Sequence, residues 1–371
     1  MQAVPKRYGT KERTNMKKLA SILLALVIAA TPMYSIAENK PKILCSIFPV
    51  YDWMREILGE RQNDVDLILL QKTGADLHNF QPTAEDFIKI SSADLFIYIG
   101  GTSDLWADDA VPEAKNKSQV ALKLTDALGD ALLEHEHEHE HEHEHEHEDE
   151  HAHDEHAHEE HAHEDEHAHE DEHTHEDEHA HAEHDHEEHE HHDHTDEHIW
   201  LSLKNAKVLC KAMLEALIKV DGEYADTYTA NCNAYIEKLD KLDKEYEAVV
   251  KNAKRDTLLF ADRFPFAYLV KDYGLNHYAA FEGCSAESEA SFETVAFLAE
   301  KADELSLPCL IVIEGSEGKI ASAVLNASKN PDRPLLVLDS MQAVDEEAAN
   351  YGANYLSIME ENLNIIKQAL N

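Results

Sequence analysis

The sequence predicts two α/β lobes with parallel sheets, joined by one long rigid helix. The first observation is that short apolar runs alternate with segments of helical spacing on both sides of residues 223–254. The second is that residues 223–254 contain neither Gly nor Pro and place apolar residues at alternating intervals of three and four. The third is a tract of His and carboxylates at 134–197, which has no apolar face and is expected to be a disordered loop inserted in the N-terminal lobe.

The N-terminal lobe is assigned to residues 38–222. Its strands are expected where Ile, Val and Leu gather in short runs, at 43–48, 65–70, 95–99 and 120–122. Helical spacing separates these runs at 50–58 and at 83–90, and Thr83 followed by Asp86 is typical of a helix capping box. Strands that alternate with helices in this way are expected to pair in parallel.

The C-terminal lobe, 255–371, repeats the alternation. Strands are expected at 257–260, 309–313 and 335–338, and a long helix at 347–370. Between the lobes, 223–254 predicts one helix of about 30 residues, which is about 45 Å long at 1.5 Å per residue. An ordinary core helix is the alternative, but the α/β units on both sides favour a connection between lobes.

The charge of the chain is concentrated in its His-rich tract. Residues 134–198 hold 31 of the 76 carboxylates and 26 of the 28 histidines. The rest of the chain therefore has 45 acidic against 32 basic residues, a net charge of about −13. Binding to nucleic acid is not expected, because contacts with backbone phosphates need clustered Lys and Arg.

Residues 1–37 are expected to be a secretory signal peptide. A basic start at 16–18, an apolar run at 19–30 and the small residues of Ser35-Ile36-Ala37 are its three parts. The apolar run is too short to span about 30 Å of hydrocarbon. Residues 1–15 have no role in such a signal, so Met1 is a candidate for a start assigned in error. The mature chain is expected in the periplasm or at the extracytoplasmic membrane surface.

Five cysteines follow the signal segment, and their odd number leaves at least one thiol unpaired within a chain. They are Cys45, Cys210, Cys232, Cys284 and Cys309. Cys45 and Cys309 lie inside apolar runs, so small core residues are expected there rather than metal ligands. The sequence contains no CxxC pair, so a thiolate zinc site is not indicated.

Polar residues follow the expected strands at the ends where ligands bind in open α/β sheets. His78 follows the second strand of the first lobe, and Asp262, Glu314 and Asp339 follow the three strands of the second lobe. His198 stands at the far end of the tract. Nitrogen and oxygen donors of these types hold zinc at about 2.0 to 2.2 Å. Their convergence at one rim indicates a metal site.

Several phrases resemble the substrate-binding proteins of zinc and manganese ABC importers. They are CSIFPVYDWMREILGE, TGADLHNFQPT, ADLFIYIGGTSDLW, DEHIWLSL and VLDS. The resemblance runs from residue 42 to the C-terminus, with a His-rich loop where zinc-specific members carry one. It implies two lobes joined by a long helix, one ion held between them and delivered to a membrane permease, and no catalysed reaction. We also expect a monomer.

The resemblance implies three metal ligands directly. His78 and His198 match the two ligand histidines, and Asp339 matches the late carboxylate. The sequence departs from the family at the remaining ligand, because the usual phrase F-H-D-x-F reads FADRF here and places Ala261 at the ligand position. Asp262 is the nearest substitute.

Other groups can complete the coordination in place of Asp262. Glu314 is one, and a water molecule is another. Arg263 can neutralise a carboxylate there and so serve as a structural partner rather than as part of the site.

Two imidazoles with carboxylates suit Zn²⁺ and also Mn²⁺, Fe²⁺, Co²⁺ or Ni²⁺, and the absence of thiolate or Met ligands disfavours Cu⁺. The tract favours zinc over manganese, because neutral imidazole binds zinc well. Accessory zinc ligands are expected in its regular part, at His135, His137, His139, His141, His143, His145 and His147.

Two other functions are alternatives to an exported zinc receptor. A periplasmic zinc buffer or metallochaperone would bind mainly through the tract, whereas a receptor would bind through the strand-end residues. A zinc hydrolase would need a general base at fixed spacing from a ligand pair. The sequence offers no such base, so the chain is not expected to be an enzyme.

Overall fold

The computed structural model of the protein describes residues 40–74, 77–133, 195–283 and 290–371. The expected signal peptide at 1–37 and the accessory histidines of the tract lie outside these residues. Residues 133–196 form a unit of their own, of which Leu133, Thr195 and Asp196 are described. The Asp196 N–H donates to the Leu133 carbonyl over 2.8 Å. The described residues on the two sides of segment 134–194 therefore lie next to each other.

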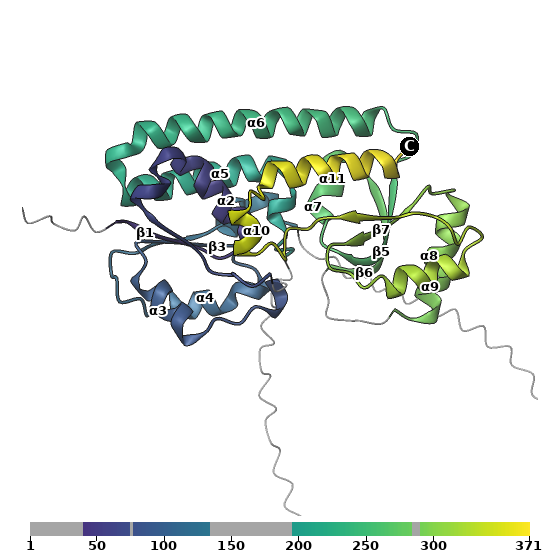
Figure 1. Ribbon diagram of the computed structural model, residues 1–371, viewed down its shortest axis with the longest axis horizontal. Helices are drawn as coiled ribbons and strands as arrows, with labels where there is room; N and C mark the ends of the chain where they lie inside the picture. Colours follow the sequence, from purple (N-terminus) through teal and green to yellow (C-terminus); the bar gives the residue numbers. More distant parts are fainter. Residues whose placement is uncertain (1–39, 75–76, 134–194, 284–289) are drawn as a thin grey trace, which may run out of the picture. The chain divides into compact units, whose positions relative to one another are not determined.

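The remaining described residues contain two four-stranded sheets (Figure 1), which confirms the predicted two-lobe α/β class. The first sheet has the order β2-β1-β3-β4 and the second β6-β5-β7-β8, and all neighbouring strands are parallel. The strands are β1 (Lys42–Cys45), β2 (Asp66–Leu69), β3 (Leu95–Tyr98), β4 (Val120–Lys123), β5 (Thr257–Phe264), β6 (Asn276–Glu282), β7 (Leu310–Ile313) and β8 (Leu335–Leu338).

Helices cover both sheets. In the first lobe, α3 and α4 lie on one face of the sheet and α2 and α5 on the other (Figure 1). The helices are α2 (Phe48–Leu58), α3 (Ala84–Ser92), α4 (Leu105–Ala110), α5 (Leu203–Val220), α6 (Ala225–Lys251), α7 (Ala267–Tyr273), α8 (Phe292–Glu304), α9 (Lys319–Ala327), α10 (Glu346–Asn350) and α11 (Tyr355–Ala369). Among the described helices, none is both long enough and apolar enough to cross a membrane.

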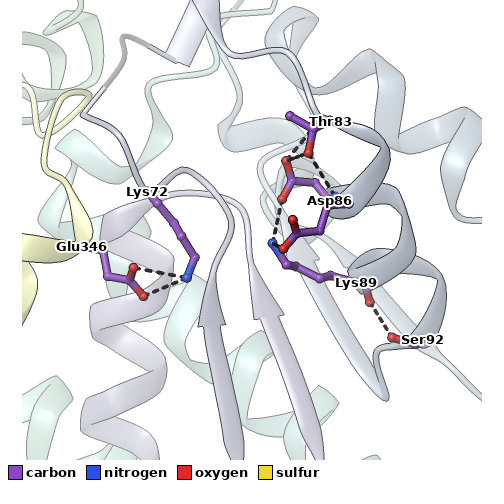
Figure 2. A network of polar contacts seen from close by, with 7 residues as sticks. Lys72, Thr83, Asp86, Lys89, Ser92 and Glu346 are labelled. Carbon is purple, nitrogen blue, oxygen red and sulfur yellow. Dashed lines mark hydrogen bonds and ion pairs between the residues drawn. The ribbon is translucent and has the colours of Figure 1, made fainter.

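The predicted capping box at the start of α3 is confirmed (Figure 2). The hydroxyl of Thr83 accepts a hydrogen bond from the Asp86 N–H over 3.3 Å, and the Asp86 carboxylate accepts one from the Thr83 N–H over 3.0 Å. Each side chain satisfies a backbone N–H that has no partner within the helix, which fixes where α3 begins. Figure 2 also shows the ion pair of Lys72 with Glu346, 3.0 Å apart, which joins the loop after β2 to α10.

The expected linking helix is observed as α6, within three residues of its predicted ends. Near its start, the Asn231 amide donates to the Ile57 carbonyl of α2 over 3.0 Å. Near its end, the Tyr246 hydroxyl donates to the Met359 carbonyl of α11 over 2.6 Å. One continuous helix is thus bonded to a helix of the first lobe and to a helix that follows the last strand of the second lobe.

The predicted C-terminal helix at 347–370 is wrong as one element. The structure has two helices, α10 and α11, because Gly352 between them adopts a φ of 104° that no α-helix contains. The Asn354 side chain then accepts a hydrogen bond from the Ser357 N–H and starts α11 as its N-cap. The prediction for Cys45 and Cys309 is confirmed, since both side chains are buried.

Asp52 makes the stability of the first lobe dependent on pH. Its side chain is buried, and its carboxylate accepts a hydrogen bond from the Tyr355 N–H over 2.8 Å. Burial raises the pKa of Asp52 to about 6, although the Tyr355 hydrogen bond and the charge of Arg55 oppose the rise. Deprotonation therefore costs more in the folded protein than in the unfolded chain.

We expect the free energy of unfolding to fall as the pH rises from about 4 to about 6, by up to about 3 kcal/mol from this group. Replacement of Asp52 by Asn removes this part of the pH dependence, because the amide oxygen still accepts the Tyr355 hydrogen bond and does not ionise. Urea unfolding of both proteins between pH 4 and pH 7 measures the difference. Parallel curves for the two proteins would contradict the assignment.

Candidate metal centre

His78 and His198 are each placed by a short helix with buried apolar residues. His78 lies in the 3₁₀ turn η2 (Leu77–Asn79), which the buried Leu77 anchors. His198 directly precedes the turn η6 (Ile199–Leu201), all of whose side chains are buried. Buried apolar neighbours in the sequence thus fix the backbone of each histidine. The two histidines are 120 residues apart in the sequence.

The two imidazoles face each other through the same ring nitrogen. Nε2 of His78 lies 3.3 Å from Nε2 of His198. Two nitrogen ligands at about 2.0–2.1 Å from a tetrahedral zinc ion are roughly 3.3 Å apart. The pair therefore has the separation that zinc requires of two of its ligands. Without an ion, the same separation fits an N–H···N hydrogen bond if one ring carries its proton on Nε2.

The other nitrogen of His78 contacts two residues that the sequence prediction missed. Its Nδ1 lies 2.9 Å from Oγ of Ser103 and 3.0 Å from Oε1 of Glu197. Ser103 belongs to the turn η3 (Thr102–Asp104) after β3, and its hydroxyl and N–H both donate to Glu197, over 2.5 Å and 2.9 Å. Glu197 directly precedes His198, so one short segment supplies both the second imidazole and a contact to the first.

Glu197 has a lowered pKa in spite of its burial. Burial by itself raises the pKa of Glu197, but hydrogen bonds from His78 and Ser103 and the nearby charge of His198 outweigh it and lower this pKa to about 2. A carboxylate with so low a pKa is an acceptor of hydrogen bonds throughout the neutral range.

In the second lobe, Glu314 follows β7 and accepts hydrogen bonds from Ser340 and Gln342 in the loop after β8. It accepts hydrogen bonds from the N–H and hydroxyl of Ser340, over 2.8 Å and 2.5 Å, and from the Gln342 N–H over 3.3 Å. Burial and the neighbouring Asp339 carboxylate raise the pKa of Glu314 to about 7. Because both oxygens of Glu314 already hold this loop, it is poorly suited to be the missing ligand.

Asp339 follows β8 in a backbone that is fixed on both sides. Its N–H donates to Oδ1 of Asn362 over 2.9 Å, and its carbonyl accepts from Nδ2 of the same amide over 2.8 Å. Its side-chain Oδ1 accepts the Met341 N–H over 2.7 Å. Burial raises the pKa of Asp339. The carboxylate is thus held at the end of its strand.

Ala261 and Asp262 occupy the place where the sequence departs from the family pattern. Ala261 is 1% exposed and packs in the apolar cluster between the second sheet and helices α8 and α9. Between Phe260 and Arg263, β5 advances three residues while β6 advances two, so a β-bulge includes both Ala261 and Asp262. Bulges re-aim side chains and are frequent beside functional sites.

Asp262 is a buried carboxylate with one unsatisfied oxygen. Its Oδ1 accepts the Arg263 N–H over 2.9 Å, whereas its buried Oδ2 has no hydrogen-bond partner among the described residues. Leaving a buried acceptor unpaired costs about 1–3 kcal/mol. A bound cation would satisfy that oxygen, which makes Asp262 a better candidate than Glu314.

Hydrogen bonds connect the His198 segment to the Asp339 loop. The indole N–H of Trp200 donates to the Ser340 carbonyl over 2.8 Å, and the Tyr355 hydroxyl donates to the Trp200 carbonyl over 2.6 Å. Gln71, which follows β2, donates its amide to the Gln342 carbonyl over 3.3 Å. The strand ends of the two lobes are therefore joined close to His198.

The structure brings together His78 and His198 but not the full predicted ligand set. Over the four described ranges, no group of three or more His, Cys, Asp or Glu side chains is close enough to hold one ion. Asp339 and Asp262 remain predicted ligands, each at the end of a strand in the second lobe.

Known proteins share both the sequence pattern and the fold. Residues 43–369 match the family model described as the periplasmic zinc-uptake complex component A, ZnuA. The chain belongs to this family. The zinc-binding protein AdcA of Streptococcus pyogenes serotype M1 is 26% identical over 356 residues, which are 95% of this chain and 60% of AdcA. The high-affinity zinc uptake system protein ZnuA of Bacillus subtilis is 26% identical over 335 residues, 90% of this chain and 88% of that protein.

A solved structure supports the fold. The Zn(II)-bound ZnuA-like domain of Streptococcus pneumoniae AdcA is similar with a TM-score of 0.62 and 23% identity, over 89% of this chain and 99% of that one. The chain spans only about 60% of the length of the AdcA relatives. The predicted resemblance to zinc-type substrate-binding proteins is confirmed. The names of the relatives describe zinc binding and uptake, in agreement with the expectation that the chain is not an enzyme.

Because one oxygen of Asp262 is unsatisfied, removing this side chain is expected to have opposite effects on stability and on zinc binding. Replacement of Asp262 by Ala is expected to raise the free energy of unfolding of the zinc-free protein by about 1 kcal/mol, because an unpaired buried acceptor is removed. The same change is expected to weaken zinc binding by at least tenfold. Urea unfolding and competition with a zinc chelator measure the two effects. Replacement of the exposed Asp332 by Ala is the control and should change neither.

Proposed function

We propose that the chain is a receptor that captures one Zn²⁺ ion and delivers it to an ABC importer permease. His78 and His198 supply two nitrogen ligands, and Asp339 and Asp262 supply oxygen ligands. The observation that carries the proposal is the Nε2–Nε2 separation of 3.3 Å in a member of the zinc-uptake family. Four ligands of these types suit tetrahedral zinc.

The proposed receptor acts outside the cytoplasm as a monomer. The basic and apolar segments within residues 1–37 support export, and the family description places its members in the periplasm. The permease is the proposed membrane partner. The acidic balance of the chain gives no support to a nucleic-acid partner.

The His/Glu tract is proposed as an accessory collector of zinc. Its regular histidines, from His135 to His147, would bind ions weakly and raise their concentration beside the receptor site. The alternative is a zinc buffer or metallochaperone, in which the tract itself is the main site. The two functions differ in what remains when the tract is removed.

The deciding experiment replaces residues 134–194 by Gly-Gly. The hydrogen bond between Asp196 and Leu133 supports a short linker, and Glu197 is kept because it contacts His78. We expect the shortened protein to retain one tightly bound zinc equivalent after desalting. A buffer would lose nearly all of its zinc, and a chain that keeps no ion would refute the receptor.

The choice of ion is tested in the same protein. Two imidazole ligands favour Zn²⁺ over Mn²⁺, because manganese prefers carboxylate, carbonyl and water oxygens. We expect a zinc-loaded sample to keep its zinc in a large excess of Mn²⁺. Displacement of zinc by manganese, measured by metal analysis after dialysis, would overturn this choice.

A further inference from the structure

We propose that Glu197 and Ser103 fix the His78 imidazole in the tautomer with its proton on Nδ1, so that the Nε2 lone pair is available to the metal ion. Glu197 and Ser103 are positioning residues in this role, since they contact the imidazole and not the ion. The inference rests on the proposed zinc-binding function and adds a group of residues that prepares the first ligand before the ion arrives.

The hydroxyl group of Ser103 donates its proton to the Glu197 carboxylate. Ser103 Oγ lies 2.5 Å from Oε1 of Glu197, and a carboxylate accepts but does not donate, so the hydroxyl donates to it. Oγ then has only lone pairs to offer Nδ1 of His78, at 2.9 Å. Ser103 therefore accepts a hydrogen bond from His78.

Glu197 reaches the same nitrogen as a second acceptor. Its Oε1 lies 3.0 Å from Nδ1. With two acceptors around it, Nδ1 carries the proton, because a bare nitrogen would face two oxygens without a hydrogen between them. In a neutral imidazole the other nitrogen is then an acceptor. That nitrogen is Nε2, which faces His198.

Glu197 is held firmly enough to impose this choice. Its side chain is only 4% exposed, and its Oε2 accepts the Ser103 N–H over 2.9 Å. It lies directly against Gly101, where an added Cβ would overlap both Cβ and Oε2 of Glu197. The φ of Gly101 is −96°, which any residue adopts, so glycine is needed here for close approach alone.

With an ion bound at Nε2 of His78, this arrangement would form a carboxylate–histidine–metal triad. In such triads the outer carboxylate orients the ring and raises the basicity of the ligand, and its loss typically weakens metal binding 10–100-fold. The same segment delivers His198, so Glu197 also couples the position of the second ligand to that of the first.

The test uses the protein with residues 134–194 replaced by Gly-Gly, labelled with ¹⁵N-histidine. Only His78, His198 and His277 remain in it, so each ring is assignable through its own alanine variant. Its melting curve is first matched to that of the full chain. We expect the long-range ¹H–¹⁵N spectrum of the zinc-free protein to show His78 with its proton on Nδ1.

Replacement of Glu197 by Gln places an amide, which is both donor and acceptor, beside Nδ1 and removes the charge. We expect a mixture of His78 tautomers and a 10–100-fold rise in the zinc Kd. Gly101→Ala, which displaces Glu197 without altering its carboxylate, is expected to act in the same direction. Glu60→Gln, at an exposed carboxylate outside the site, is the control and should leave spectrum and Kd unchanged.

The outcomes separate the two proposals. An unchanged His78 tautomer with a Kd within twofold of the parent in both E197Q and G101A would overturn the role of Glu197. If either variant fails to fold, the other and Ser103→Ala decide by the same spectrum. A parent protein that binds no zinc would refute the proposed function, while its zinc-free spectrum would still test the tautomer.

Discussion

Replacement of His78 or His198 by alanine is expected to abolish retention of the single zinc ion by the protein whose tract is replaced by Gly-Gly. The free energy of zinc binding to tetrahedral sites in small domains is about 10–16 kcal/mol. Each of four ligands then contributes roughly a quarter of it. The loss of one imidazole is thus expected to raise the Kd by on the order of 100-fold or more. Competition with a chromophoric chelator measures the zinc Kd of each variant.

His277 supplies the matched control for these variants. It lies on β6, where its ring stacks on Phe264 with the ring centroids 3.8 Å apart. Replacement of His277 by alanine removes an imidazole without touching the pair of facing rings. Its zinc affinity should equal that of the parent. If all three alanine variants bind zinc equally well, the ion is held elsewhere in the chain.

Replacement of Trp200 by alanine is expected to lower the free energy of unfolding by about 3–5 kcal/mol. The Trp200 side chain is fully buried. Its loss leaves a large cavity and leaves the Ser340 carbonyl without the indole donor. Because this bond ties the segment of His198 to the loop of Asp339, we expect zinc binding to weaken as well. Urea unfolding and chelator competition measure the two effects.

A variant at Trp53 serves to separate the effect of Trp200 on stability from its effect on zinc binding. It is equally buried, but it lies in α2 and packs edge-on against Tyr355, with ring centroids 5.1 Å apart. Trp53→Ala should cost similar stability and leave zinc affinity unchanged in the molecules that remain folded. Trp200→Phe keeps most of the packing and should still weaken zinc binding. Equal zinc affinity in the three variants would show that the Trp200 bond does not position the site.

The sequence was sufficient to predict the two sheets and the linking helix, because their signals are local. Short runs rich in Ile, Val and Leu mark seven of the eight described strands, and the uninterrupted three-four spacing marks α6. Strand β6 was missed, since NHYAAFE has no such run and forms an edge strand by pairing with β5. The break before α11 was missed because apolar spacing continues on both sides of Gly352.

The site was only partly predictable for a different reason. His78 and His198 stand out by residue type and by the phrases around them. Glu197 does not, because it is one of 31 carboxylates in the same stretch, and only its contacts with His78 and Ser103 distinguish it. The bulge that contains Asp262 depends on the register between β5 and β6, which no local pattern specifies.

The hydrogen bond between Asp196 and Leu133 has a consequence for the length of the tract. A segment whose two ends meet can gain or lose residues with little effect on the domain around it, because each doubling of loop length costs only about 0.6 kcal/mol in closure entropy. Changes in tract length are therefore expected to leave the stability of the domain around it nearly unchanged.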